Sequence, residues 1–448
     1  MTAVLTRAWS APRTATAPRV ATTVCVATAA TVSLAPSLLP RAAAVQAIVT
    51  GVLVAVGWGL ASLVRRASRK STGAVESGSP VRIAVAWAGA VTTAAALLLA
   101  QHWQNAVRAA MGEPPTGVAY WMVVVVGSVA VAGTLVVIAA GIRSVHRNRA
   151  VRRVTAAVLA AAVAIVFWVG PTARVAGAID AADAAAELSL PRPQSPSLSG
   201  SADSLTPWQT LGGQGRRFVT APASPSTVRT YVGLGSAPDL DSRVRLAIRE
   251  LERAGGFARS HLVITVPTGS GWIDANAVAG FERRFGGDVA EVAVQYSSAP
   301  SWATFVFDRG SAEVSARALY AAVVHRLSEL PAESRPALYV YGQSLGAVGA
   351  AAAGASCGVL LAGPPGGRLP APGVAVLANA SDPVVHWSPR LLVSPFRRDG
   401  TRPDAPTPPW VPVVSFLQTT VDLLTALDSA PGHGHRYGTD QGLGLPDC

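Results

Sequence analysis

Hydrophobic residues follow two different patterns along the chain: long unbroken runs before residue 180 and short runs between polar segments after residue 228. An α-helix needs about 20 apolar residues to cross a bilayer. Five stretches of the first part approach or exceed that length: 20–40, 44–64, 83–101, 119–142 and 154–173. They predict an α-helical transmembrane region of about five spans within residues 1–180.

Basic residues alternate between the segments that join these stretches. Clusters of arginine precede the first stretch and lie between the second and third and between the fourth and fifth, whereas the intervening segments hold only Arg41 and Arg108. Cytoplasmic loops are the ones enriched in basic residues. We therefore predict a multi-pass protein of the cytoplasmic membrane, with the lipid bilayer as a partner, its N-terminus inside and the chain after about residue 175 outside. The spans lack clear acidic residues, which disfavours transport.

Residues 181–228 are rich in proline and serine, a composition that predicts an extended linker. The segment PWQTLGGQGRRF at 207–218 interrupts it. Its Trp208 and Phe218 pack on the next domain or at the membrane interface, or they belong to a solvated linker; the sequence leaves these readings open.

From residue 229 to 448, short β-branched runs alternate with amphipathic segments, which predicts a doubly wound α/β domain with a mostly parallel sheet. The expected strands are 230–234, 261–267, 291–296, 337–342, 358–363 and 374–379. The expected helices are near 240–254, 274–285, 310–329 and 345–355.

A G-x-S-x-G motif, Gly342-Gln343-Ser344-Leu345-Gly346, follows the fourth expected strand and opens an alanine-rich helix. A serine on such a sharp strand-to-helix turn projects its hydroxyl above the sheet, where it can act as a nucleophile. The pentapeptide alone is weak in a chain this rich in glycine and serine. Its position between a strand and a helix makes Ser344 the candidate nucleophile, against the alternative of an inactive glycine–serine turn.

A nucleophilic serine needs a carboxylate and a histidine, which follow it in that order in this type of fold. Asp382 leaves the end of the last expected strand and is our candidate acid, with Asp428 as a weaker substitute and an Asp-Pro turn as the alternative. His433 and His435 lie in a glycine-rich loop near the C-terminus, and either can be the base; we favour His435. A metal site is disfavoured because no acidic or cysteine cluster accompanies them.

The oxyanion of acyl transfer needs two preorganised N–H donors. The first would be Leu345, directly after the serine, and the second Thr268 or Gly269 in the glycine-rich loop 267–272. An ordinary glycine-rich connection is the alternative for that loop. This chemistry requires no cofactor.

The net charge of +12 does not indicate nucleic-acid binding. Residues 1–180 hold 16 basic and 3 acidic residues, which leaves 21 basic and 22 acidic residues for the remainder. The C-terminal part therefore lacks a basic footprint. Cys357 and Cys448 either form a disulfide in an oxidising compartment or remain free thiols.

Several motifs together resemble the actinobacterial membrane-anchored α/β-hydrolases, which join a multispan N-terminal region to a C-terminal α/β-hydrolase domain. The matching segments are 33–41, 207–218, 231–237, 267–272, 294–302, 339–346, 362–365, 381–389 and 431–438. Two features depart from the family pattern: the interval 366–372 is short, and the chain stops at Cys448 without the usual final helix. In addition, residues 410–427 read as a helix and not as a last strand.

The resemblance and the ordered triad predict a membrane-anchored serine hydrolase, esterase- or lipase-like, acting on lipid or cell-envelope esters. Two other functions stay open, an envelope acyltransferase and a non-catalytic membrane scaffold on a decayed hydrolase fold. Neither the substrate nor the oligomeric state follows from the sequence.

Overall fold

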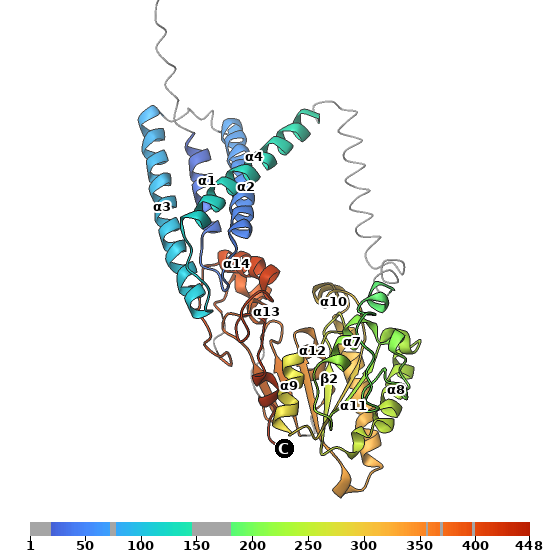
Figure 1. The fold of residues 1–448 in the computed structure, drawn as a ribbon. Helices are drawn as coiled ribbons and strands as arrows, with labels where there is room; N and C mark the ends of the chain where they lie inside the picture. Colours follow the sequence, from blue (N-terminus) through green and yellow to red (C-terminus); the bar gives the residue numbers. More distant parts are fainter. Residues whose placement is uncertain (1–18, 72–77, 146–180, 355–356, 368–370, 397–398) are drawn as a thin grey trace, which may run out of the picture. The chain divides into compact units, whose positions relative to one another are not determined.

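The computed structural model describes residues 19–71, 78–145, 181–354, 357–367, 371–396 and 399–448 (Figure 1). These residues form two compact units that divide near Arg152. We call them the membrane unit and the C-terminal unit.

Among the described residues, the membrane unit contains four helices: α1 (Val20–Ser33), α2 (Ala43–Ser71), α3 (Ser79–Ala110) and α4 (Val118–Val145). Three of the described helical segments are long and apolar enough to cross a membrane, namely Ala43–Ser68, Ser79–Ala110 and Val118–Ile142, which supports membrane association. The prediction of about five spans is not supported. The first expected span contains only the 14-residue α1, because Pro36 and Pro40 lie in the non-helical segment that follows. The fifth lies outside the described residues.

Small residues allow the helices of the membrane unit to pack closely. A methyl group added at Gly127 would lie 2.8 Å from Cβ of Ala47, and one added at Gly51 would lie 2.6 Å from Cβ of Val131. Such close approach is a common basis of helix association in membranes. Gln46 connects α2 to the end of α1, because its Nε2 donates a 2.9 Å hydrogen bond to the Ser33 carbonyl oxygen.

The C-terminal unit contains a six-stranded sheet in which all neighbouring strands are parallel. Its strands are β1 (Val228–Val232), β2 (His261–Val266), β3 (Val289–Val294), β4 (Ala337–Gln343), β5 (Gly358–Ala362) and β6 (Val374–Leu377), in the spatial order β1-β3-β2-β4-β5-β6. Each strand expected from the sequence is present, with ends displaced by at most two residues. Burial on both faces explains why their apolar runs are nearly continuous.

Helices cover both faces of this sheet (Figure 1). One core packs α8 (Leu240–Arg253), α11 (Arg309–Ser328) and α12 (Leu345–Ala353) against alternate strand residues. The opposite face carries α7 (Gly212–Thr220), α9 (Ala275–Arg284) and the C-terminal segment. The described residues also form the helices α10 (Ser301–Phe307), α13 (Pro383–His386), α14 (Val414–Asp422) and α15 (Asp440–Leu443). They include the short 3₁₀ turns η1 (Trp208–Thr210), η2 (Leu234–Ser236), η3 (Gly256–Ala258), η4 (Ala332–Ser334), η5 (Pro389–Leu392) and η6 (Leu423–Thr425).

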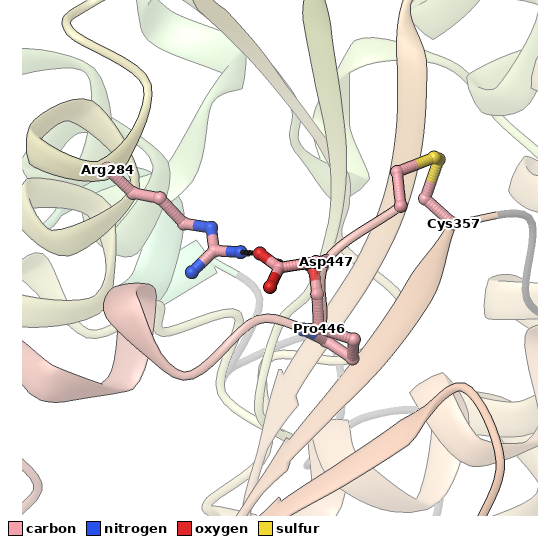
Figure 2. Close-up of a disulfide and its surroundings, with 5 residues drawn as sticks. Arg284, Cys357, Pro446 and Asp447 are labelled. Atoms are coloured by element: carbon pink, nitrogen blue, oxygen red, sulfur yellow. Dashed lines mark hydrogen bonds and ion pairs between the residues drawn. A yellow bond between two sulfur atoms is a disulfide. The ribbon is translucent and has the colours of Figure 1, made fainter.

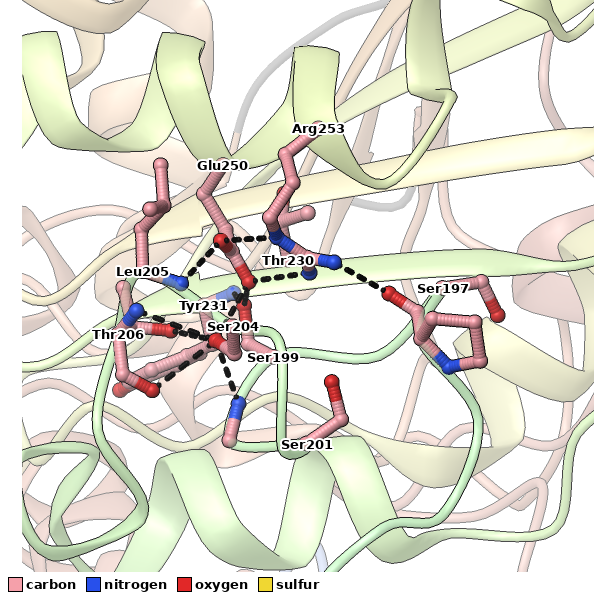
Figure 3. Close-up of polar contacts among 12 residues, drawn as sticks. Ser197, Ser199, Ser201, Ser204, Leu205, Thr206, Thr230, Tyr231, Glu250 and Arg253 are labelled. Atoms are coloured by element: carbon pink, nitrogen blue, oxygen red, sulfur yellow. Dashed lines mark hydrogen bonds and ion pairs between the residues drawn. The ribbon is translucent and has the colours of Figure 1, made fainter.

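The segment predicted as an extended linker is instead folded onto the sheet. Trp208, Leu211 and Phe218 are buried with Tyr231 of β1 in one apolar cluster. Earlier in the same segment, Ser199 Oγ and Ser204 Oγ donate hydrogen bonds to the buried carboxylate of Glu250 on α8, at 3.0 Å and 2.6 Å (Figure 3). The linker prediction from composition was wrong, because the prolines and serines of this segment make their contacts with residues far along the chain.

Glu250 is held in its charged form by the same contacts. Burial opposes ionisation, but the hydrogen bonds from Arg253, Ser204 and the Leu205 N–H lower the pKa of Glu250 below its ordinary value. Arg253 also donates to the Pro196 carbonyl oxygen at 2.8 Å. A charged, fully satisfied Glu250 therefore attaches residues 196–205 to α8.

A disulfide between Cys357 and Cys448 closes the C-terminus onto the start of β5, across 91 residues of sequence (Figure 2). Arg284 on α9 holds the same segment by hydrogen bonds to the Leu443 carbonyl oxygen at 2.9 Å and to Asp447 Oδ1 at 2.6 Å. The short α15 lies in this segment. The C-terminal residues thus form part of the packed domain.

Candidate active site

Ser344 lies at the turn between β4 and α12 in a strained backbone conformation. Its φ of 55° and ψ of −125° lie outside the regions that non-glycine residues normally adopt. This conformation is typical of a nucleophilic serine raised on a strand-to-helix turn. The pentapeptide recognised in the sequence therefore has the local geometry expected of a nucleophile elbow.

Close contacts explain the two glycines of the pentapeptide. A methyl group at Gly346 would lie 2.3 Å from the Val266 carbonyl oxygen at the end of β2, and one at Gly342 would lie 2.2 Å from the Gly346 carbonyl oxygen. Neither position can hold a side chain without moving the backbone. The Ser344 N–H donates a 2.9 Å hydrogen bond to the Ala362 carbonyl oxygen of β5, which ties the turn to the sheet.

Asp382, the predicted acid, is fully buried just beyond β6 and caps the start of α13. Its Oδ1 accepts the Val384 N–H at 2.8 Å. Its Oδ2 accepts the His435 Nδ1–H at 2.7 Å and the Tyr437 hydroxyl at 2.6 Å. The three donors satisfy the oxygens of a carboxylate that would otherwise be costly to bury.

His435 is the histidine that lies beside Asp382. Gly363 leaves room for its ring, because a methyl group there would lie 2.6 Å from His435 Cε1. Gln343, directly before Ser344, donates from Nε2 to the His435 carbonyl oxygen at 3.2 Å. Among the described residues, the buried His435 Nε2 has no hydrogen-bond partner. The Ser344–His435 hydrogen bond expected of the triad is therefore not among the hydrogen bonds of the described residues.

His433 has a different partner, Asp404, whose Oδ2 lies 3.2 Å from His433 Nδ1. Asp404 also accepts the Ser381 N–H at 2.9 Å and the Ser381 hydroxyl. The Gly434 N–H in turn donates to Ser381 Oγ at 2.8 Å. This second aspartate–histidine pair thus fastens the loop that carries His435 to the loop that carries Asp382.

The predicted oxyanion donors lie in two loops that meet at the elbow. Leu345 is the first residue of α12, so its N–H has no acceptor within the helix. A methyl group at Gly346 would come within 3.0 Å of the Pro267 carbonyl oxygen, which brings the 267–272 loop against the elbow. The Thr268 N–H already donates to the Trp272 carbonyl oxygen at 2.9 Å. Between the two candidates for the second donor, this contact favours Gly269.

Sequence reasoning missed Tyr437 and Asp404. Burial and the neighbouring Asp382 carboxylate raise the pKa of Tyr437 well above its ordinary value, so the phenol stays protonated and donates. Tyr437 belongs to the same PGHGHRYG segment as the two histidines, which was an available signal. Asp404 lies among prolines and alanines with no such signal.

His386 and Asp428, two further polar residues of this part of the chain, do not contribute side chains to the Asp382–His435 pair. His386 is buried, with its Nε2 2.9 Å from the Ala380 carbonyl oxygen, and burial lowers its pKa. Asp428 is exposed. His386 also lines a cavity of about 660 Å³ between the 366–367 loop and η5, together with Val385, Arg390 and Phe396. Within the described part of the chain, no group of three or more His, Cys, Asp or Glu residues could hold a metal ion.

A parallel doubly wound sheet with a strained serine after its central strand, followed along the chain by a buried aspartate–histidine pair, defines the α/β-hydrolase class of protein. A family model described as "Alpha/beta-hydrolase family" matches residues 228–369 and 361–444, and a second, described as the N-terminus of that family, matches residues 34–222. The chain belongs to this alpha/beta-hydrolase family. No curated protein and no solved structure matches it.

Proposed function

We propose that this protein is a membrane-anchored serine hydrolase that cleaves carboxylic esters of lipids or of the cell envelope. One observation carries the proposal: His435 Nδ1 lies 2.7 Å from the buried Asp382 Oδ2, with Nε2 left unpartnered among the described residues. The carboxylate orients the imidazole, and Nε2 is the nitrogen that would take the serine proton.

In the proposed reaction, Ser344 Oγ attacks the ester carbonyl carbon while His435 Nε2 takes the hydroxyl proton. Asp382 holds the imidazole in the tautomer with its proton on Nδ1 and stabilises the imidazolium that forms. The imidazolium then protonates the leaving alcohol, and an acyl-enzyme remains on Ser344. Water then attacks the acyl carbon while His435 takes its proton, and the imidazolium returns that proton to Ser344 Oγ as the acid leaves.

The tetrahedral intermediate carries a negative charge on the former carbonyl oxygen. Backbone N–H groups of Leu345 and Gly269 are the proposed donors to that oxygen. Removing one such donor from a site of this kind typically costs about a hundred- to a thousand-fold in kcat.

The proposed location is the outer face of the cytoplasmic membrane. The alternation of basic segments along the sequence favours an inner N-terminus and an outer C-terminal unit. The Cys357–Cys448 disulfide supports the same side, because disulfides persist in oxidising compartments. An enzyme held there meets membrane lipids and envelope esters first, which is the argument for the substrate class.

Activity-based labelling of the full chain in detergent tests this proposal. A fluorophosphonate probe should label wild type and should fail to label Ser344→Ala, while Ser334→Ala, which changes an exposed serine on η4, should label like wild type. An unlabelled wild type, or a Ser344→Ala protein labelled as strongly as wild type, would refute the assignment. The first result would favour a non-catalytic scaffold.

Hydrolysis and acyl transfer share the same acyl-enzyme. Product analysis of a labelled lipid ester, with and without glycan or lipid alcohols as acceptors, separates them. We expect free acid as the main product in both mixtures; an acceptor ester formed in preference to the acid would identify an envelope acyltransferase.

A further inference from the structure

The chain between Asp382 and His435 exposes an unusual concentration of apolar side chains. In the described part of the C-terminal unit, twelve large hydrophobic residues are exposed, and six of them lie between residues 393 and 427. We call these six the apolar face: Val393, Val411, Val413, Leu417, Leu424 and Leu427. Leu424 and Val393 are exposed by 80% and 77%, which is extreme for large aliphatic side chains. A clustered apolar surface marks a site of interaction.

A backbone contact brings together two of the elements that carry these residues. The Val413 N–H donates to the Leu392 carbonyl oxygen at 3.2 Å, which brings the start of α14 beside η5 and Val393. Val413 directly precedes α14, Leu417 lies on α14, and Leu424 lies on the 3₁₀ turn η6 that follows it, so all three belong to one continuous segment. Figure 1 shows α13 and α14 close together, at the part of the C-terminal unit drawn in orange-red.

Two tryptophans lie next to α13 and α14, and the indole N–H of each donates a hydrogen bond. Trp387 donates to Thr420 Oγ1 at 2.9 Å and packs against Phe416, and Trp410 donates to the Leu391 carbonyl oxygen at 2.9 Å. Tryptophan is enriched where proteins meet the membrane–water interface. Arg390 on η5 is exposed nearby and provides a cation of the kind that lipid phosphates attract.

The partner that this chemistry fits is a lipid surface. The same chain carries three helices able to cross a bilayer, so the C-terminal unit cannot diffuse away from one. Tethering makes even weak surface binding effective, because the local concentration of lipid is high. Exposed leucine and valine on and beside a short helix, with tryptophan and arginine nearby, resemble the pattern of an interfacial helix.

We propose that the apolar face inserts into the surface of the bilayer and presents the active site to esters embedded there. A backbone hydrogen bond links the apolar face to the proposed base. The backbone N–H of His435 donates to the carbonyl oxygen of Ala426 at 3.0 Å, and Ala426 lies between Leu424 and Leu427 in the chain. The insertion is inferred from the exposed residues alone. The delivery of embedded esters to the active site rests, in addition, on the proposed function.

Lipid-quenching fluorescence tests the insertion without using activity. The full chain would carry Cys25→Ser, leaving the bridged Cys357 and Cys448, and one new cysteine, Leu417→Cys, labelled with an environment-sensitive dye in bilayer nanodiscs. Val324→Cys is the matched control, because Val324 and Leu417 are exposed by 38% and 40% and Val324 lies near the end of α11 that leads away from the site. Lipids brominated in the acyl chain should quench the dye at 417 at least three-fold more than the dye at 324.

Three results would overturn the proposal. Quenching at 417 by aqueous iodide and not by brominated lipid would place the face in water. Quenching by neither agent would mean that protein covers it, whether another copy or another part of this chain. Equal lipid quenching at 417 and 324 would show unspecific contact with the bilayer.

Activity then tests delivery separately. Leu417→Asp and Leu424→Asp should lower hydrolysis of an ester embedded in the bilayer at least ten-fold and leave hydrolysis of a short, water-soluble ester within two-fold of wild type. Equal losses on both esters, or none on the embedded one, would contradict delivery. A wild type that fluorophosphonate does not label would refute the proposed function and leave the quenching result intact.

Discussion

His435 Nδ1 lies 2.7 Å from Asp382 Oδ2, although 53 residues of sequence separate the two. His433, two residues earlier, contacts a different carboxylate, that of Asp404. The two imidazoles of one short loop therefore have separate partners, and the contacts of each predict different consequences of mutation.

Asp382→Asn should lower kcat for ester hydrolysis by about a thousand- to ten-thousand-fold, because an amide disfavours the histidine tautomer that accepts the serine proton. Steady-state hydrolysis of a soluble ester by the detergent-solubilised chain measures this. Asp428→Asn, at the exposed alternative carboxylate, should stay within two-fold of wild type. A large loss in Asp428→Asn with little in Asp382→Asn would exchange the two assignments.

His435→Ala should abolish fluorophosphonate labelling on the timescale of the wild-type reaction. His433→Ala and Asp404→Asn should instead slow labelling by roughly ten-fold, because they loosen the attachment of the loop and leave the base in place. Rates of labelling with limiting probe distinguish the two classes. If His433→Ala were the more damaging change, the base would be His433.

Glu291 should make stability depend on pH. It is fully buried on β3, both its carboxyl oxygens lack hydrogen-bond partners among the described residues, and the nearby Arg229 also pairs with Glu282. Burial raises the pKa of Glu291 to about 8 from 4.5. Between these two values the folded state keeps a proton that the unfolded state has lost, so the free energy of unfolding falls as pH rises.

The full loss above the folded-state pKa is on the order of 5 kcal/mol. Glu291→Gln should remove this dependence, and thermal unfolding of the solubilised chain at several values from about pH 5 to 9 would show it. Glu333→Gln, at an exposed glutamate on η4, should retain the wild-type slope. A slope unchanged in Glu291→Gln would mean that another group is responsible.

Cys448→Ser should lower the free energy of unfolding of the C-terminal unit by about 2–4 kcal/mol, because the disulfide closes a long loop and restricts the unfolded chain. Reductant should destabilise wild type by a similar amount and have little further effect on the variant. Cys25→Ser provides the control, since Cys25 is a free thiol of α1. Wild-type stability in Cys448→Ser would show that the bridge has no stabilising role.

Much of the fold was predictable from local pattern. The apolar runs near 261–267 and 337–342 became β2 and β4, and the segment 410–427 became α14 and η6 as its helical pattern indicated. The elbow was predictable for the same reason, because strand, turn and helix are contiguous around Ser344. The number of spans was not predictable in this way, because hydropathy measures the apolar length of 20–40 and takes no account of Pro36 and Pro40.

The sequence by itself determined the order of strands and helices, the nucleophile elbow and the candidate acid, because backbone preferences and burial patterns act over a few neighbouring residues. Only the tertiary structure decided which histidine meets Asp382, that Asp404 and Tyr437 complete the polar contacts, and that residues 196–227 pack on the domain. Those outcomes depend on contacts between residues tens of positions apart, and they are made only when the whole sheet brings its loops together.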